Sequence, residues 1–205
     1  MIKIDHILER ESQNFLDEHV ASIDKKGVKV ITRVFKGKLI DTIEFACKSL
    51  GVDLIVLEPR TNSIKEEVYL GNTSGKIIKQ TQIPALIVPE NYEYKPIVKI
   101  LMAVKSVLFK KENALKPLTD IKDQYKSILN LLLVETPKYK EGDLDISEDL
   151  SKLITNTTKS KSQNTFQGVL EHYQNHNPDL LCEETARCKT GFGIFYINRE
   201  LPKTM

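Results

Sequence analysis

The strongest constraint on the fold comes from two short apolar runs, residues 53–57 (DLIVL) and 84–88 (PALIV). Each run is too short for a typical helix, and both are rich in the branched side chains that strands prefer. Unbroken apolar runs of this kind are typical of parallel strands that are covered on both faces. A helical pattern over Glu66 to Gln80 lies between them, so the stretch predicts a strand, a crossover helix and a parallel strand.

The same alternation extends over most of the chain. Apolar periodicity predicts further helices over residues 5–24, 40–50, 112–125, 146–154 and 166–173, and further strands over residues 28–35, 97–104, 127–136 and 177–184. The polar tract TNTTKSKSQNT, residues 155–165, has neither periodicity and is predicted to be a loop. Strands that alternate with helices indicate an α/β protein with an open, mainly parallel sheet.

Composition narrows the class of protein. The 205 residues carry a formal net charge of +2, which implies no strong field for nucleic acid or for an anionic membrane. The three cysteines, Cys47, Cys182 and Cys188, show no pairing pattern and favour a reducing compartment. No apolar run approaches the roughly 18 residues that a membrane span requires. We therefore expect a soluble cytoplasmic protein that binds neither nucleic acid nor membrane.

Two segments suggest that the chain contains a repeat. The sequence PDLLCEE, residues 178–184, parallels VDLIVLE at residues 52–58. Between these copies, residues 91–96 (NYEYKP) break the pattern with polar side chains and a proline, as a linker would. The predicted division is a first copy over residues 1–90, a linker over 91–96 and a second copy over 97–205.

These segments resemble the universal stress protein family in its tandem, two-copy form. Residues 51–90 and the stretch that follows, residues 91–135, carry the resemblance. It implies a flavodoxin-like, doubly wound sheet with strand order 3-2-1-4-5, and a homodimer or a pseudo-dimer within one chain. By this comparison the first copy lacks its front strands and the second copy lacks its last strand. The chain would then be a fragment, a product of a misplaced start, or a shape completed by another chain.

Nucleotide-binding members of this family hold ATP with a motif of three glycines followed by serine or threonine, and the resemblance places that motif after the fourth strand. In the first copy the leading glycines fall at Glu58 and Thr61, the third at Gly71 and the hydroxyl residue at Asn72. A carboxylate about 4 Å from a phosphate costs roughly 4 kcal/mol at an effective dielectric constant near 20. Gly71, Asn72, Thr73 and Ser74 remain as a candidate anion-binding corner.

The second copy departs further from the family pattern. Lys105 occupies the position of the acidic residue that meets the adenosine, and Glu184, Arg187 and Ile197 occupy the glycine positions. Neither copy keeps a complete motif. The resemblance therefore implies a degenerate nucleotide site.

Other clusters have simpler structural explanations. His172, His176, Cys182 and Cys188 include a helical pair that could ligate zinc, but Cys182 lies in an apolar strand and is expected to be a buried thiol. The acidic group Asp143, Asp145, Glu148 and Asp149 lacks the glycine turn of a calcium loop and suits the start of a helix. GNTSGKI, residues 71–77, lacks the spacing of a phosphate-binding P-loop.

No catalytic triad or paired-carboxylate arrangement can be assembled from neighbouring strand ends, so the sequence favours a protein without enzymatic activity. The first hypothesis is a stress-response protein that acts through binding or dimerisation and carries no cofactor. The alternative is a universal stress protein that binds ATP or AMP and hydrolyses ATP slowly. A third hypothesis is a regulatory domain from an ion antiporter.

Overall fold

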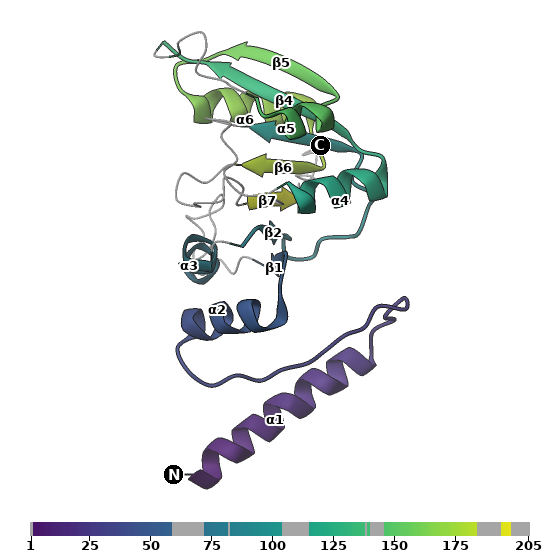
Figure 1. Cartoon of the computed structure of the whole chain (residues 1–205), viewed down its shortest axis with the longest axis vertical. Coiled ribbons are helices and arrows are strands. Elements are labelled where there is room, and N and C mark those ends of the chain that lie inside the picture. The colour runs from purple at the N-terminus through teal and green to yellow at the C-terminus, as the bar shows by residue number, and fades with distance from the viewer. Residues whose placement is uncertain are drawn as a thin grey trace, which may run out of the picture. The chain divides into compact units, whose positions relative to one another are not determined.

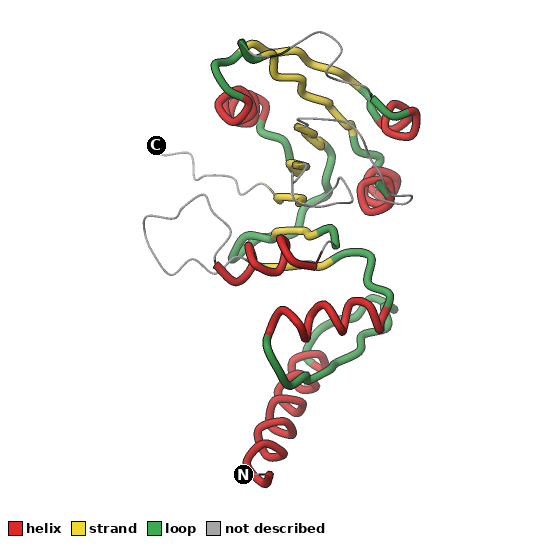
Figure 2. The backbone as a smooth tube through the Cα atoms, turned by 60° about the vertical axis from the view of Figure 1, so that its left-hand side comes forward, coloured by secondary structure: helices red, strands yellow, loops and turns green. Residues whose placement is uncertain are grey.

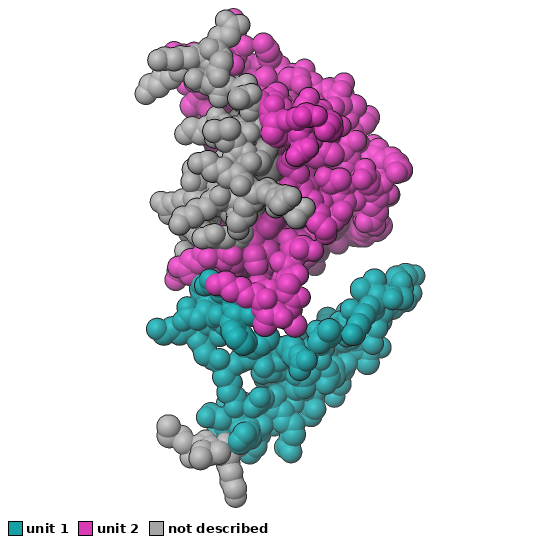
Figure 3. All heavy atoms as spheres, viewed as in Figure 1, with its two compact units in different colours: residues 1–46 teal, residues 47–205 magenta. Residues whose placement is uncertain are grey.

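The structure is a computed structural model of the chain, and it describes residues 2–58, 72–81, 83–103, 115–137, 139, 146–183 and 194–197. These residues divide into two compact units, residues 1–46 and 47–205, which Figure 3 distinguishes by colour. None of the helices in the described ranges is both long enough and apolar enough to cross a membrane.

The first unit contains a long helix and an extended segment. Helix α1 spans Ile2–Ala21 and fits the predicted amphipathic pattern. Residues 28–35 are described but form no strand, so the predicted strand in this segment is wrong. The segment is extended, but it pairs with no other strand in the described part of the chain. Helix α2, Leu39–Leu50, begins in this unit.

The second unit is built on one sheet of seven strands, shown in Figure 1. The strands are β1 (Ile55–Leu57), β2 (Ala85–Ile87), β3 (Lys99–Ala103), β4 (Ile128–Glu135), β5 (Asn156–Lys161), β6 (Leu180–Glu183) and β7 (Ile194–Ile197). Their order is β1-β2-β7-β6-β3-β4-β5, and every neighbouring pair is parallel except β6 and β7. The predicted α/β class and mainly parallel sheet are confirmed.

Helices cover both faces of this sheet, as Figure 2 shows. They are α3 (Asn72–Thr81), α4 (Lys116–Tyr125), α5 (Glu148–Leu153) and α6 (Thr165–His176). Leu118 of α4 and Leu150 of α5 pack with Ile100 and Met102 on one face. Val169 of α6 packs with Leu101 on the other face. The arrangement is doubly wound, because apolar side chains that alternate along a strand meet helices on opposite sides.

The register confirms the predicted neighbours β1 and β2 at one side of the sheet. Ile55 pairs with Ala85, so the two apolar runs that most constrained the fold lie side by side. Ile100 lies between Leu129 and Leu180. The carboxylate of Asp179 accepts hydrogen bonds from the main-chain N–H groups of Val98 (2.9 Å) and Lys99 (2.8 Å), which ties the start of β6 to the start of β3.

Two strands differ from the sequence prediction. The tract predicted to be a loop contains β5, an edge strand whose side chains are mostly polar. Polar and lysine side chains are typical of edge strands, because they discourage pairing with further chains. The other is β7, whose segment the sequence analysis assigned no strand; it pairs with both β6 and β2.

Candidate functional site

The carboxyl edge of the sheet, where the parallel strands end, is the place at which open α/β sheets bind ligands. The chain runs from β3 outward through β4 to β5 and then returns to β6 on the other side of β3. The switch point therefore lies between Ala103 and Glu183, which are register partners at the ends of β3 and β6. The residues that follow these two strands, 104–114 and 184–193, lie outside the described residues.

Four acidic residues stand at or just after the carboxyl ends of strands. They are Glu58 after β1, Glu90 after β2, Glu135 at the end of β4 and Glu183 at the end of β6. Glu58 and Glu90 are exposed, whereas Glu135 and Glu183 are half-buried. The described part of this edge is thus rich in carboxylates.

Glu183 occupies the least solvated of these positions. Burial raises the pKa of its carboxyl group above the usual value, because a partly apolar surrounding disfavours the charged form. Tyr196 lies near it on the neighbouring strand β7, and burial, followed by the charge of Glu183, raises the pKa of the Tyr196 phenol. A carboxyl group with a shifted pKa at the switch point is a feature shared by many functional sites.

The predicted anion-binding corner falls at the start of α3. This helix begins at Asn72, and Gly71 lies outside the described residues together with Pro59 and Thr61. Nothing is described of the side chains of Asn72 and Thr73. The side chain of Ser74 is buried in the second unit, so its hydroxyl group does not face solvent.

A polar groove of about 600 Å³ lies where β4 and β5 end beside the first turns of α6. Its lining combines carboxylates, amides and one lysine: Glu135, Thr136, Pro137, Tyr139, Lys161, Ser162, Gln163, Gln167 and Glu171. Helix α6 packs closely against β4 and forms one wall of this groove. A Cβ atom at Gly168 would lie 2.6 Å from Cγ1 of Val134, so only glycine lets α6 approach β4 this closely.

A second polar cluster connects α6 to the outer strands. The Thr158 hydroxyl donates to Oδ1 of Asn130 (3.1 Å), and Nδ2 of Asn130 lies 3.3 Å from Nε2 of His172. The His176 ring stacks on His172 with centroids 3.9 Å apart. Burial, and then the charge of His176, lowers the pKa of His172. Sequence reasoning missed this network, because it placed Thr158 in a loop.

The zinc hypothesis is not supported by the described residues. Cys182 packs in the core with Leu118 and Leu150, whereas His172 lies on the face covered by α6. The thiol of Cys182 is free and buried, and burial raises its pKa. The described residues hold no cluster of three metal-ligating side chains, and Cys188 lies outside them.

The acidic residues at the start of α5 fit a helix start better than a calcium loop. Glu148 and Asp149 lie in the first turn of this helix, and the hydroxyl of Ser147 caps it by accepting a hydrogen bond from the N–H of Leu150. Negative charge at a helix start is favoured by the helix dipole. Asp143 and Asp145 lie outside the described residues.

Comparison with known protein families finds a similarity in the first part of the chain. Residues 4–89 match the model of the Universal stress protein family. This part of the chain is therefore similar to the universal stress protein family. No curated protein matches the chain.

Solved structures show that the wider fold is that of universal stress proteins. A universal stress protein from Archaeoglobus fulgidus DSM 4304 is 17% identical and has a TM-score of 0.63, and the match covers 96% of this chain and 78% of that protein. A putative universal stress protein from Pseudomonas aeruginosa UCBPP-PA14 is 13% identical with a TM-score of 0.55, covering 92% of this chain and 78% of the other.

Three residues at the family's motif positions lie in the described part of the chain, and one of them, Asn72, begins α3. Glu58 follows β1 directly and is exposed. Ile197 is the last residue of β7 and packs against the core. Thr61, Gly71, Lys105, Glu184 and Arg187 lie outside the described residues.

Proposed function

We propose that the protein is a non-catalytic universal stress protein that acts by binding another protein or by pairing with a second copy, without a bound nucleotide. The observation that carries the proposal is the acidic carboxyl edge, where Glu58 and Glu90 follow strands β1 and β2, and strands β4 and β6 end at Glu135 and Glu183. Each carboxylate near a phosphate would weaken binding, because two like charges about 4 Å apart repel by roughly 4 kcal/mol at an effective dielectric constant of 20.

Calorimetric titration of the whole chain with Mg-ATP and with AMP tests this proposal. We expect no saturable heat below millimolar nucleotide, and no excess absorbance at 260 nm in the purified protein. Binding at micromolar concentration would overturn the proposal in favour of the nucleotide-binding alternative.

A pair of variants tests whether the negative charge of the carboxyl edge is the reason that nucleotide does not bind. The double variant Glu58→Gln, Glu183→Gln removes two carboxylates from the edge and should bind ATP at least about tenfold more tightly than the parent chain. Glu18→Gln on α1 removes the same kind of charge elsewhere and should change nothing. Equal affinities for the two variants would show that charge at the edge is not what excludes the nucleotide.

The alternative, binding of ATP or AMP with slow hydrolysis, has one observation in its favour. Helix α3 starts at Asn72, within the predicted anion-binding corner, and the N–H groups of a first helical turn attract anions. The burial of Ser74 weighs against it, because a buried hydroxyl cannot reach a phosphate in solvent. The titration above separates the two functions.

A further inference from the structure

The extended segment of the first unit, residues 28–35, pairs its main chain only at Val28, whose N–H donates to the carbonyl of Lys25 (2.8 Å), within the described part of the chain. Within the described part of the protein, no main-chain hydrogen bond joins residues 29–37 to any other segment. The sequence VKVITRVF is rich in branched and aromatic side chains, which favour strands. A strand-like segment with free N–H and C=O groups is a template for pairing with another strand.

In the described part of the chain, side chains make the polar contacts that join helix α1 to this segment and to Lys36 just after it. Nε2 of Gln13 donates to the hydroxyl of Thr32 (2.7 Å), and Nζ of Lys36 lies 2.8 Å from a carboxylate oxygen of Glu9. These contacts anchor the segment without using its main chain. The first unit therefore presents an extended backbone that is already positioned for a partner.

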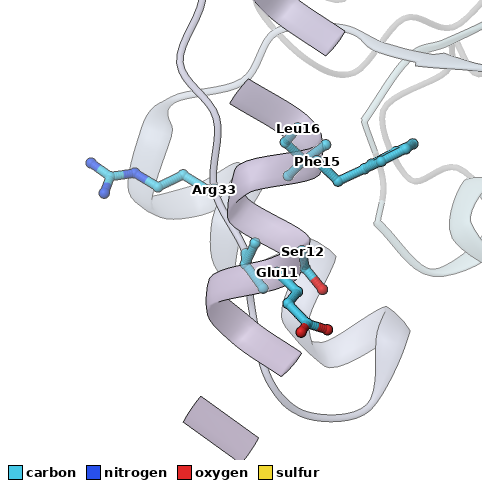
Figure 4. Close-up of a pocket in the computed structure, with 6 residues that line it drawn as sticks. Glu11, Ser12, Phe15, Leu16 and Arg33 are labelled. Carbon is cyan, nitrogen blue, oxygen red and sulfur yellow. The ribbon is translucent and has the colours of Figure 1, made fainter. Parts of the chain in front are cut away.

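Apolar side chains along the segment remain in solvent. Val28 is 66% exposed and Ile31 is 55% exposed. A groove of about 520 Å³ runs beside the segment and is lined by Phe15 and Leu16 of α1 together with Arg33 and Val34. Figure 4 shows Phe15 and Arg33 pointing in opposite directions. Exposed apolar side chains on and beside this segment are compatible with an interaction surface.

The charge of the segment indicates which charge its partner carries. Residues 25–38 contain six basic residues and no acidic residue. Among the described residues, Lys26 pairs with Asp24 and Lys36 pairs with Glu9, whereas no ion pair is found for Lys29 or Arg33. Because side chains alternate along an extended chain, Lys29, Ile31, Arg33 and Phe35 share one face. A complementary strand would alternate acidic and apolar side chains on that face.

We propose that residues 28–35 are the docking site for an extended, acidic segment of another protein, which adds to them as a β-strand. The proposal rests on the proposed function, in which the protein acts through binding. A polypeptide suits the site better than a nucleic acid, because a backbone phosphate accepts hydrogen bonds but donates none. The same segment of a second copy suits it poorly, because pairing would set basic side chains against basic side chains.

A synthetic probe tests the proposal on the full chain. The fluorescein-labelled peptide Glu-Thr-Val-Thr-Glu-Thr-Val-Thr-Glu reads the same in both directions, so it presents the complementary face to a parallel or an antiparallel partner strand. We expect saturable binding by fluorescence polarisation that weakens as salt is raised from 50 to 500 mM. The peptide with lysine in place of every glutamate should not bind, and neither should the glutamate peptide with alternate amides methylated.

Two charge reversals of the protein sharpen the test. Arg33→Glu should weaken peptide binding at least about tenfold, because like charges across an interface repel. Arg10→Glu makes the same change on α1 and should alter binding less than about twofold. Circular dichroism checks that both variants fold, and the methylated peptide provides a test that needs no variant.

Several results would overturn the proposal. These are the absence of saturable binding, equal binding of the two peptide charge types, and equal effects of the two reversals. Tighter binding of single-stranded RNA or of phosphatidylserine vesicles than of the peptide would assign the surface to another class of partner. Dimerisation in sedimentation experiments that competes with the peptide would assign it to a second copy. None of these outcomes depends on the nucleotide titration, so the two proposals can fail separately.

Discussion

Helices α1 and α6 both carry apolar side chains at helical spacing, but they differ in what they bury. In α6, Val169 and His172 are buried against the sheet. In the first unit, none of the described side chains from residue 4 to residue 46 is buried, and Phe15 is 70% exposed. A helix in a protein owes most of its stability to the packing of its apolar face. The difference teaches that periodicity predicts a helix but not whether a partner covers it.

The largest expected effect compares two phenylalanines. Phe195 of β7 is fully buried, so Phe195→Ala should lower the free energy of unfolding by about 3–5 kcal/mol through lost burial and a cavity. Phe15→Ala should change it by less than about 0.5 kcal/mol. Urea denaturation followed by circular dichroism measures both. Similar losses for the two variants would mean that the first unit has a core of its own.

A smaller effect is expected where α6 meets β4. Gly168→Ala places a methyl group against Val134 and should cost about 1–3 kcal/mol. Val134→Ala in the same chain should recover part of that loss, because it removes the atom that clashes. Additive losses in this double-mutant cycle would contradict the close contact.

The stability of the parent chain should depend on pH differently from the stability of a variant without His172. The folded pKa of His172 is lowered, so the neutral ring stabilises the fold above the ordinary pKa near 6.5, and that contribution is lost as the pH falls below it. We expect His172→Gln to lose less stability than the parent chain between pH 8 and pH 5. Urea midpoints at the two pH values measure this, and parallel losses would contradict it.

The smallest effect has the opposite sign and concerns Glu183. Its folded pKa is raised, so its charge destabilises the fold as the pH rises above the ordinary carboxyl pKa near 4.3. Glu183→Gln should therefore raise the urea midpoint at pH 8 and leave it nearly unchanged at pH 4. Glu58→Gln, at an exposed position, is the matched control. A rise that is equal at both pH values would show that the charge is not the cause.

The sequence predicted most of the sheet but missed β5 at one edge and β7 in the interior. Central strands such as β3 and β4 are mostly apolar, and burial on both faces explains why they are easy to recognise. The edge strand β5 was missed because its side chains are polar, and residues 28–35 were predicted as a strand because they have strand-forming side chains. A strand also requires a neighbour, which composition does not reveal.

The candidate site was predictable to a lesser degree. Glu58 follows β1, as the sequence indicated. The half-buried environment of Glu183 and the network of Asn130, Thr158 and His172 arise from residues far apart in the chain. Local sequence patterns do not predict contacts between distant residues, so only the folded structure reveals them.

Hydrogen exchange of the full chain, measured by mass spectrometry with and without the acidic peptide, tests the central contrast most directly. We predict that amides of residues 29–36 exchange at nearly the rate of a free chain, while those of β4 exchange at least about a thousandfold more slowly. The peptide should then protect residues 29–36 and leave β4 unchanged. Strong protection of residues 29–36 in the chain alone, or no change on adding the peptide, would contradict the account.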